Sequence, residues 1–107
     1  MISKNKTKNK TKNTTVLFDS GTVVITPGAS CMLVRNNAHV EEFLARHFAG
    51  DWGDCCKEDS KMNDDAVEFG GRVLSSYKVR DEKLWIITDG VGKTQSYATT
   101  VLLPEEY

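Results

Sequence analysis

The sequence RVLSSYKVRDEKLWIITDGVGKTQSYATTVLL, residues 72–103, is rich in β-branched and aromatic residues that alternate with polar ones. This period of two is typical of half-buried β-strands. Three strands are predicted, over residues 72–79, 83–88 and 96–103. The connections between them, residues 80–82 and 89–95, are short, so neighbouring strands are expected to run antiparallel as a meander.

The residues before this meander predict one further β segment and three helices. The β segment covers residues 16–26 as one strand or two, and ends at Pro27-Gly28. The helices are predicted over residues 29–35, 38–49 and 55–69. Asn36 or Asn37 is expected to cap the second helix and Asp54 the third, because side chains of these types accept hydrogen bonds from the first helical amides.

Two of these helices carry a stripe with helical spacing. The stripe of the second helix consists of Val40, Phe43, Leu44, His47 and Phe48. That of the third is less apolar and consists of Cys55, Asp59, Met62, Ala66 and Phe69. Together the elements predict an α+β fold, in which two to three helices pack on one face of a three- or four-stranded antiparallel sheet. Residues 16–107 are expected to form a single domain.

The composition excludes membrane and fibrous proteins. Of the 107 residues 39% are hydrophobic and 27% charged, and only 3 are cysteines. No apolar run reaches the ~18 residues of a membrane span, and the N-terminus lacks the apolar segment of a secretory signal. We therefore expect a cytoplasmic protein with reduced thiols. It is expected to be a monomer or a homodimer, the latter paired through an edge strand at residues 96–103.

The charges are divided unevenly along the chain. Five lysines alternate with Asn or Thr before the first acidic residue: Lys4, Lys6, Lys8, Lys10 and Lys12. Of the 14 basic residues nine remain for the rest of the chain, against 15 acidic ones, which gives that part a net charge of −6. The tail, residues 1–15, has almost nothing to bury and is predicted to be disordered.

A glycine-rich segment near the C-terminus resembles a phosphate-binding loop but does not meet its requirements. Residues 90–94, GVGKT, supply the Gly-Lys-Thr end of that motif. The motif also needs a glycine five positions before Gly92, where this chain has Ile87, and a helix after the threonine, where a strand is predicted. A hairpin turn is the better interpretation, and no cofactor is expected.

A cluster of metal-compatible residues surrounds the start of the third helix. Cys55 and Cys56 lack the spacing of zinc ligands and make a poor disulfide. A thiol at a helix N-terminus has a lowered pKa, so either is a candidate reactive thiol, although an inert, partly buried thiol is commoner. His47 is expected to be a core histidine with one hydrogen-bond partner. A small enzyme or metal site around these residues is a minor alternative, and no catalytic or metal-binding residue is assigned.

The segment RHFAGDWGD, residues 46–54, is either an elaborate connector or a recognition loop. Gly50 and Gly53 permit a tight, left-handed turn. Asp51 is expected to accept hydrogen bonds from turn amides or to pair with Arg46 or Arg72. Trp52 is either a core plug or an exposed anchor. As a recognition loop the segment gives this set of candidate binding residues: Arg46, Asp51, Trp52, Asp54 and Arg72.

Five segments carry a resemblance to one protein family: LARHFAGDWGD (44–54), EDSKMND (58–64), GGRVLSSY (70–77), LWIIT (84–88) and TTVLLPEEY (99–107). They are similar to segments of small proteins encoded on bacterial plasmids and other mobile elements. The resemblance covers about residues 18–107 and rests mostly on RHxxGDWG and LLPEEY. It implies a bacterial cytoplasmic protein in a mobile-DNA context, without an assigned activity. The chain departs from the pattern in its lysine tail, its adjacent cysteines and an extended turn at residues 89–98.

Two functional hypotheses follow. The favoured one is a non-enzymatic accessory protein of a mobile element, which binds a protein partner through its acidic body, the turn around Trp52 and the acidic C-terminus, residues 104–107. Trp52→Ala is then expected to abolish binding without unfolding the protein. The alternative is a nucleic-acid-associated protein that uses the lysine tail, and removal of residues 1–13 would then abolish binding and its salt dependence.

Overall fold

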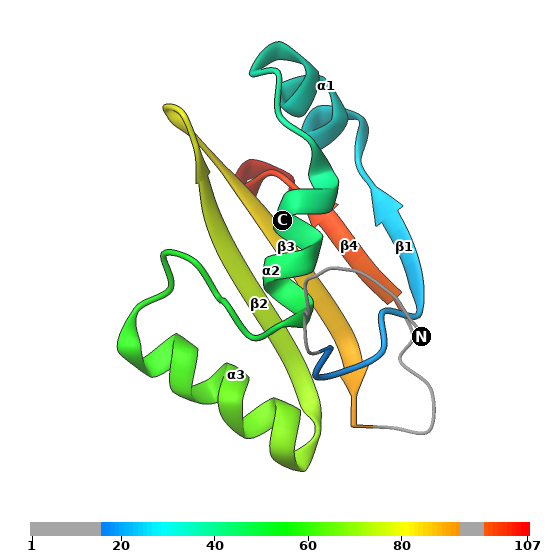
Figure 1. Ribbon diagram of the computed structural model, residues 1–107, viewed down its shortest axis with the longest axis vertical. Coiled ribbons are helices and arrows are strands. Elements are labelled where there is room, and N and C mark those ends of the chain that lie inside the picture. Colours follow the sequence, from blue (N-terminus) through cyan, green and yellow to red (C-terminus); the bar gives the residue numbers. More distant parts are fainter. Residues whose placement is uncertain (1–15, 93–97) are drawn as a thin grey trace, which may run out of the picture.

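The computed structural model describes residues 16–92 and 98–107. Over these ranges three helices accompany a four-stranded sheet, which confirms the predicted α+β class (Figure 1). The elements are β1 (Thr22–Ile25), α1 (Pro27–Arg35), α2 (Val40–Phe48), α3 (Lys57–Phe69), β2 (Gly71–Val79), β3 (Glu82–Val91), β4 (Ala98–Leu102) and the 3-10 helix η1 (Pro104–Glu106). The predicted tail disorder, the tail lysines and the Lys93-Thr94 part of the glycine-rich turn lie outside the described residues.

The sheet has the strand order β1-β4-β3-β2, and its last three strands form the predicted antiparallel meander. The prediction of a purely antiparallel sheet is wrong, because β1 pairs with β4 in parallel, with Val23 opposite Thr99. The three helices and two strands between β1 and β4 carry the chain back across the sheet, which is the long connection that parallel pairing requires. The described strand of the predicted edge segment, β4, is therefore interior rather than an edge.

The second link of the meander, between β3 and β4, begins later than predicted. β3 continues to Val91, three residues beyond its predicted end. A register shift between Gly71 and Val73 marks a β-bulge, and Gly90 adopts a left-handed φ of 81°. The bulge absorbs an extra residue of β3, so the strand extends into the segment that was predicted as a loop.

The core lies between the sheet and the helices α1 and α2. One face of β2 is buried along its length, and it consists of the alternate residues Val73, Ser75, Tyr77 and Val79. Its neighbours in the core are Ala29, Met32, Leu33, Phe43, Leu84, Ile86 and Val101. In Figure 1, α2 crosses in front of the sheet, whereas α3 lies alongside β2. Two helices thus cover one face, and the third flanks the edge of the sheet.

The helix caps differ from those predicted. α1 begins at Pro27, and the Thr26 side chain accepts a hydrogen bond from the N–H of Ala29. Asn36 does not cap α2; its side chain instead donates to the carbonyl of Met32 at the end of α1, and α2 follows His39. Asp54 does not cap α3, because its backbone is engaged by β2, and the cap position is Cys56. None of the helices in the described ranges is long and apolar enough to cross a membrane.

The C-terminal segment packs back on the fold. The Glu106 carboxylate accepts hydrogen bonds from the Thr26 hydroxyl (2.6 Å) and from the N–H of Leu103 (2.8 Å). The ring of Tyr107 lies 5.7 Å from that of Trp85, a residue that points away from the helix-covered face because side chains alternate along a strand. The acidic segment at residues 104–107 is therefore held by intramolecular contacts.

Candidate functional site

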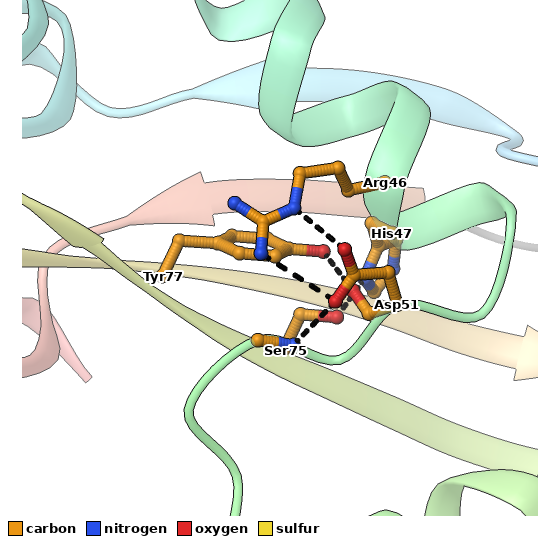
Figure 2. Close-up of polar contacts among 6 residues, drawn as sticks. Arg46, His47, Asp51, Ser75 and Tyr77 are labelled. Atoms are coloured by element: carbon orange, nitrogen blue, oxygen red, sulfur yellow. Dashed lines mark hydrogen bonds and ion pairs between the residues drawn. The ribbon is translucent and has the colours of Figure 1, made fainter.

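The turn after α2 is closed by Arg46 and Asp51 (Figure 2). Arg46 Nε donates to Asp51 Oδ2 at 2.7 Å, and Asp51 Oδ1 accepts from the N–H of Gly53 at 3.1 Å. The hydrogen bond from Arg46 lowers the pKa of the Asp51 carboxyl. The Arg46 guanidinium also lies 4.6 Å from the centre of the Tyr77 ring, whose hydroxyl donates to the Asp51 carbonyl at 2.6 Å. Both roles predicted for Asp51 are thus present and close the turn, and the bond from the Tyr77 hydroxyl attaches the turn to β2.

The end of the turn pairs with the outer edge of β2. The N–H of Ser76 donates to the Trp52 carbonyl at 3.1 Å, and the N–H of Asp54 donates to the Ser76 carbonyl at 2.6 Å. Gly53, between them, has a φ of 74°, and a Cβ at this position would collide with the Ser76 carbonyl oxygen. Glycine is therefore required here for the loop to reach the strand.

Trp52 is the core plug and not the exposed anchor. Only 6% of its surface is exposed, and its indole stacks on Phe18 with ring centres 6.2 Å apart. Its Nε1–H donates to Asp64 Oδ1 on α3 at 2.9 Å, and its ring belongs to the same buried cluster as Ala66. The residue therefore joins the turn to α3 and offers almost no surface to a partner.

His47 is a fully buried core histidine with two hydrogen-bond partners rather than the one predicted. Its Nδ1 lies 2.6 Å from Ser75 Oγ and its Nε2 lies 2.9 Å from Thr88 Oγ1. Thr99 gives its single hydroxyl hydrogen to the Ser20 carbonyl, so Thr88 must donate to Thr99. Thr88 then accepts from His47 Nε2–H, which leaves Nδ1 as the acceptor. Burial lowers the pKa of this imidazole to about 3.

The cysteines do not join His47 in one site. Cys55 Sγ donates to the Leu74 carbonyl at 3.3 Å, and burial raises the pKa of this thiol. The prediction of a lowered pKa is wrong for Cys55, because desolvation outweighs any favourable effect of the nearby helix. Cys56 is exposed at the cap position of α3. Within residues 16–92 and 98–107 no group of three His, Cys, Asp or Glu residues is arranged to hold a metal ion.

The remaining candidate residues are dispersed. Arg72 does not contact Asp51; it donates to Asp89 Oδ1 at 2.8 Å and to the Tyr107 hydroxyl at 2.5 Å. Asp54 is exposed, and its contribution to the turn is the backbone bond to β2 described above. Four of the candidate binding residues thus lie in or beside the turn after α2: Arg46, Asp51, Trp52 and Asp54. The fifth, Arg72, binds the C-terminal Tyr107 instead.

A groove between α3 and β2 was not predicted. It has a volume of about 540 Å³. Its walls come from one helix, one strand and the glycines between them: Asp59, Met62, Asn63, Asp65, Ala66, Phe69, Gly70, Gly71, Arg72 and Leu74. Two large apolar residues of the groove are exposed, Met62 by 66% and Phe69 by 77%. Four members of the predicted stripe line this open groove, Asp59, Met62, Ala66 and Phe69, and of these only Ala66 is buried. The fifth member, Cys55, precedes α3 and does not line the groove.

The orientation of α3 is set by a polar residue. The Asn63 side chain accepts from the N–H of Leu74 at 3.0 Å and donates to its carbonyl at 2.7 Å, as a neighbouring strand would. Asn63 is buried, which turns Met62 and Phe69 outwards. The resulting surface is acidic, because residues 57–69 contain five acidic residues against two lysines, a net charge of −3.

Comparisons with protein-family models, curated proteins and solved structures give no match. The resemblance to plasmid-borne proteins stays a prediction, and the functional interpretation rests on the geometry of the groove and the turn.

Proposed function

We propose that this protein is a non-enzymatic protein-binding module whose contact surface is the groove between α3 and β2. Its partner inserts a large apolar side chain into the groove and carries lysine or arginine residues beside it. The observation that carries this proposal is the pair of exposed apolar residues, Met62 and Phe69, at the walls of a groove on an acidic helix.

The apolar part of the surface supports binding by burial. Soluble proteins rarely expose neighbouring large apolar side chains without a binding role, and interface energy concentrates where such side chains fill pockets. Phe69 and Met62 stand seven residues apart, two helical turns, so they line the same side of α3. A groove of about 540 Å³ has room for a large apolar side chain of a partner.

The charge of α3 supports a basic partner. Lys61 pairs with Asp65 at 3.4 Å, and Arg72 pairs with Asp89, so these two cations are already engaged by acidic partners. The surplus carboxylates on the helix attract lysine and arginine of a partner. Such complementarity raises the association rate and discriminates between partners more than it raises affinity.

The turn around Trp52 supports the site indirectly in this proposal. It fixes α3 beside β2 through the bond from Trp52 to Asp64, while Asn63 fixes the rotation of the helix. The proposal therefore revises the hypothesis of direct contact through Trp52. The resemblance to plasmid-borne proteins adds the expectation that the partner is a bacterial host protein.

The test uses two synthetic amphipathic helical peptides of equal length, one of lysine and leucine and one of glutamate and leucine. Isothermal titration of the full chain is expected to give micromolar binding of the lysine peptide and none of the glutamate peptide. Phe69→Glu and Met62→Glu are expected to weaken binding at least tenfold. Val34→Glu is the matched control, because Val34 on α1 is 77% exposed, as Phe69 is. Circular dichroism verifies that each variant is folded.

Equal binding of both peptides, or equal loss with Val34→Glu, would contradict the proposal. Binding of duplex DNA that disappears when the five tail lysines are replaced by glutamine, together with no peptide binding, would favour the alternative function.

A further inference from the structure

Among residues 16–92 and 98–107, no strand pairs with the outer edge of β1, so the described fold leaves this apolar edge of the sheet open. β1 is the terminal strand next to β4, and Figure 1 places it at the outer side of the sheet. Each of its residues is exposed, including Val23 (41%), Val24 (47%) and Ile25 (39%). The strand contains no charged residue, although charges are a usual protection of an edge against pairing.

The opposite edge of the same sheet is protected by the chain itself. Ser76 of β2 pairs with the backbone at Trp52 and Asp54, and Leu74 pairs with the Asn63 side chain. The fold therefore covers one sheet edge with its own polar groups and presents β-branched residues along the other. Such an edge is a template for a further strand.

The free groups of β1 are identified by its pairing with β4. The N–H of Thr26 donates to the Val101 carbonyl at 3.0 Å, so Thr26 faces β4. Because alternate residues of a strand direct their N–H and C=O groups to opposite sides, Val24 also faces β4, and Val23 and Ile25 direct theirs away from the sheet.

We propose that a second copy of this chain binds here, with its β1 antiparallel to the first β1 and Val24 opposite Val24 on the two-fold axis. In this register Val23 and Ile25 of one copy exchange N–H and C=O bonds with Ile25 and Val23 of the other. A register centred on Ile25 would place Pro27, which has no N–H, opposite Val23. The central register uses every outward-facing group, and the two sheets become continuous.

The occupant is a second copy because the edge is self-complementary. An uncharged strand of β-branched residues pairs with itself without charge repulsion, and a two-fold contact is satisfied equally from both sides. The assembly closes at two copies, since the outer edges of the joined sheet are the protected β2 edges. A strand this short buries less than the ~800 Å² per partner of a standard interface, so the dimer is expected to be weak. The surface differs from the α3–β2 groove, and the two proposals fail separately.

The test is the concentration dependence of the mass of the full chain in sedimentation equilibrium. The expected mass rises with concentration from 11.9 kDa towards twice that value and no further. Val24→Lys places two lysines opposite each other and is expected to weaken the dimer about tenfold, because like charges in a cross-strand pair repel and the valine pair is lost. An equimolar mixture of Val24→Lys and Val24→Glu is expected to restore the dimer, because the opposite charges then meet on the axis.

Val34→Lys is the control, since this equally apolar residue on α1 lies outside β1 and is expected to leave dimerisation unchanged. A mass of 11.9 kDa at all concentrations up to about 1 mM would overturn the proposal, since even a weak strand-paired dimer is populated there. A dimer that is insensitive to Val24→Lys, a mixture that does not recover, or growth beyond two copies would overturn it as well. Circular dichroism of each variant separates loss of pairing from loss of folding.

Discussion

Replacing Trp52 by alanine separates a structural role of the turn from a recognition role. The indole is buried between the turn and α3, stacks on Phe18 and lies 5.9 Å from the His47 ring. If these contacts hold the turn in place, Trp52→Ala destabilises the fold. If Trp52 is an anchor for a partner, the substitution removes binding and leaves stability unchanged.

The expected magnitude follows from the burial of the side chain. Replacement of a buried tryptophan by alanine costs about 3–5 kcal/mol, from lost apolar burial and the cavity that remains. The hydrogen bond to Asp64 adds less, because the Asp64 residue is exposed and water replaces the indole as its partner. Small domains have free energies of unfolding of about 5–15 kcal/mol. Trp52→Ala is therefore expected to remove about a fifth or more of the free energy of unfolding.

The assay is equilibrium unfolding in urea, followed by far-ultraviolet circular dichroism. With a slope of about 1–3 kcal/mol per molar urea, the midpoint is expected to fall by roughly 1–5 M. Trp52→Phe keeps an aromatic ring without the N–H and is expected to lose about 1–2 kcal/mol. If the free energy of unfolding of Trp52→Ala lies within about 0.5 kcal/mol of the wild-type value, the structural role of Trp52 is refuted, because removal of a buried indole costs more than that.

Three further predictions concern single residues. The pKa of His47 is about 3 in the folded protein against 6.5 for an ordinary histidine, so its contribution to stability is complete above pH 6.5 and is lost as the pH falls towards 3. In urea unfolding between pH 6.5 and 4, the slope of the free energy of unfolding against pH should be steeper in the wild type than in His47→Gln by up to about 1.4 kcal/mol per pH unit, and equal slopes in the two proteins would contradict the assignment. Asn63→Ala is expected to cost about 1–3 kcal/mol and to accelerate hydrogen exchange at the Leu74 amide, whereas exchange as slow as in the wild type would show that Asn63 does not cap β2. Because burial raises the pKa of Cys55, iodoacetamide should modify the exposed Cys31 and Cys56 first, as mass spectrometry of peptides can measure, and faster modification of Cys55 would argue for a reactive thiol after all.

The antiparallel part of the sheet was predictable because apolar and polar side chains alternate along its strands. The period of two in β2 and β3 identified the buried face, and the short link between them fixed their antiparallel pairing. The partner of β1 was not predictable, because its strand of four residues pairs with a segment more than seventy positions away. Nothing local in a short strand distinguishes a parallel partner from an antiparallel one.

The candidate site was predictable only in part. The Arg46–Asp51 pair and the left-handed glycines of the turn follow from the residues themselves. The burial of Trp52 does not, since an indole between glycines suits a plug or an anchor equally. The helical spacing put Met62 and Phe69 in the stripe of α3, but both are exposed, and Asn63, outside the stripe, is buried with its amide bonded to the edge of β2. The sequence signal that could have identified the buried side of α3 was Asn63, the single amide side chain among residues 57–69.

In the proposed function, a partner binds at the groove between α3 and β2, and the turn around Trp52 supports the groove from inside. The most direct measurement is a titration of the full chain with the lysine–leucine peptide, followed by amide chemical shifts in nitrogen-15 spectra. The largest changes in amide chemical shift are expected between Asp59 and Leu74, with little change in β1 or α1. Largest shifts in the N-terminal lysine segment or in α1, or no shifts at millimolar peptide, would contradict the proposed function.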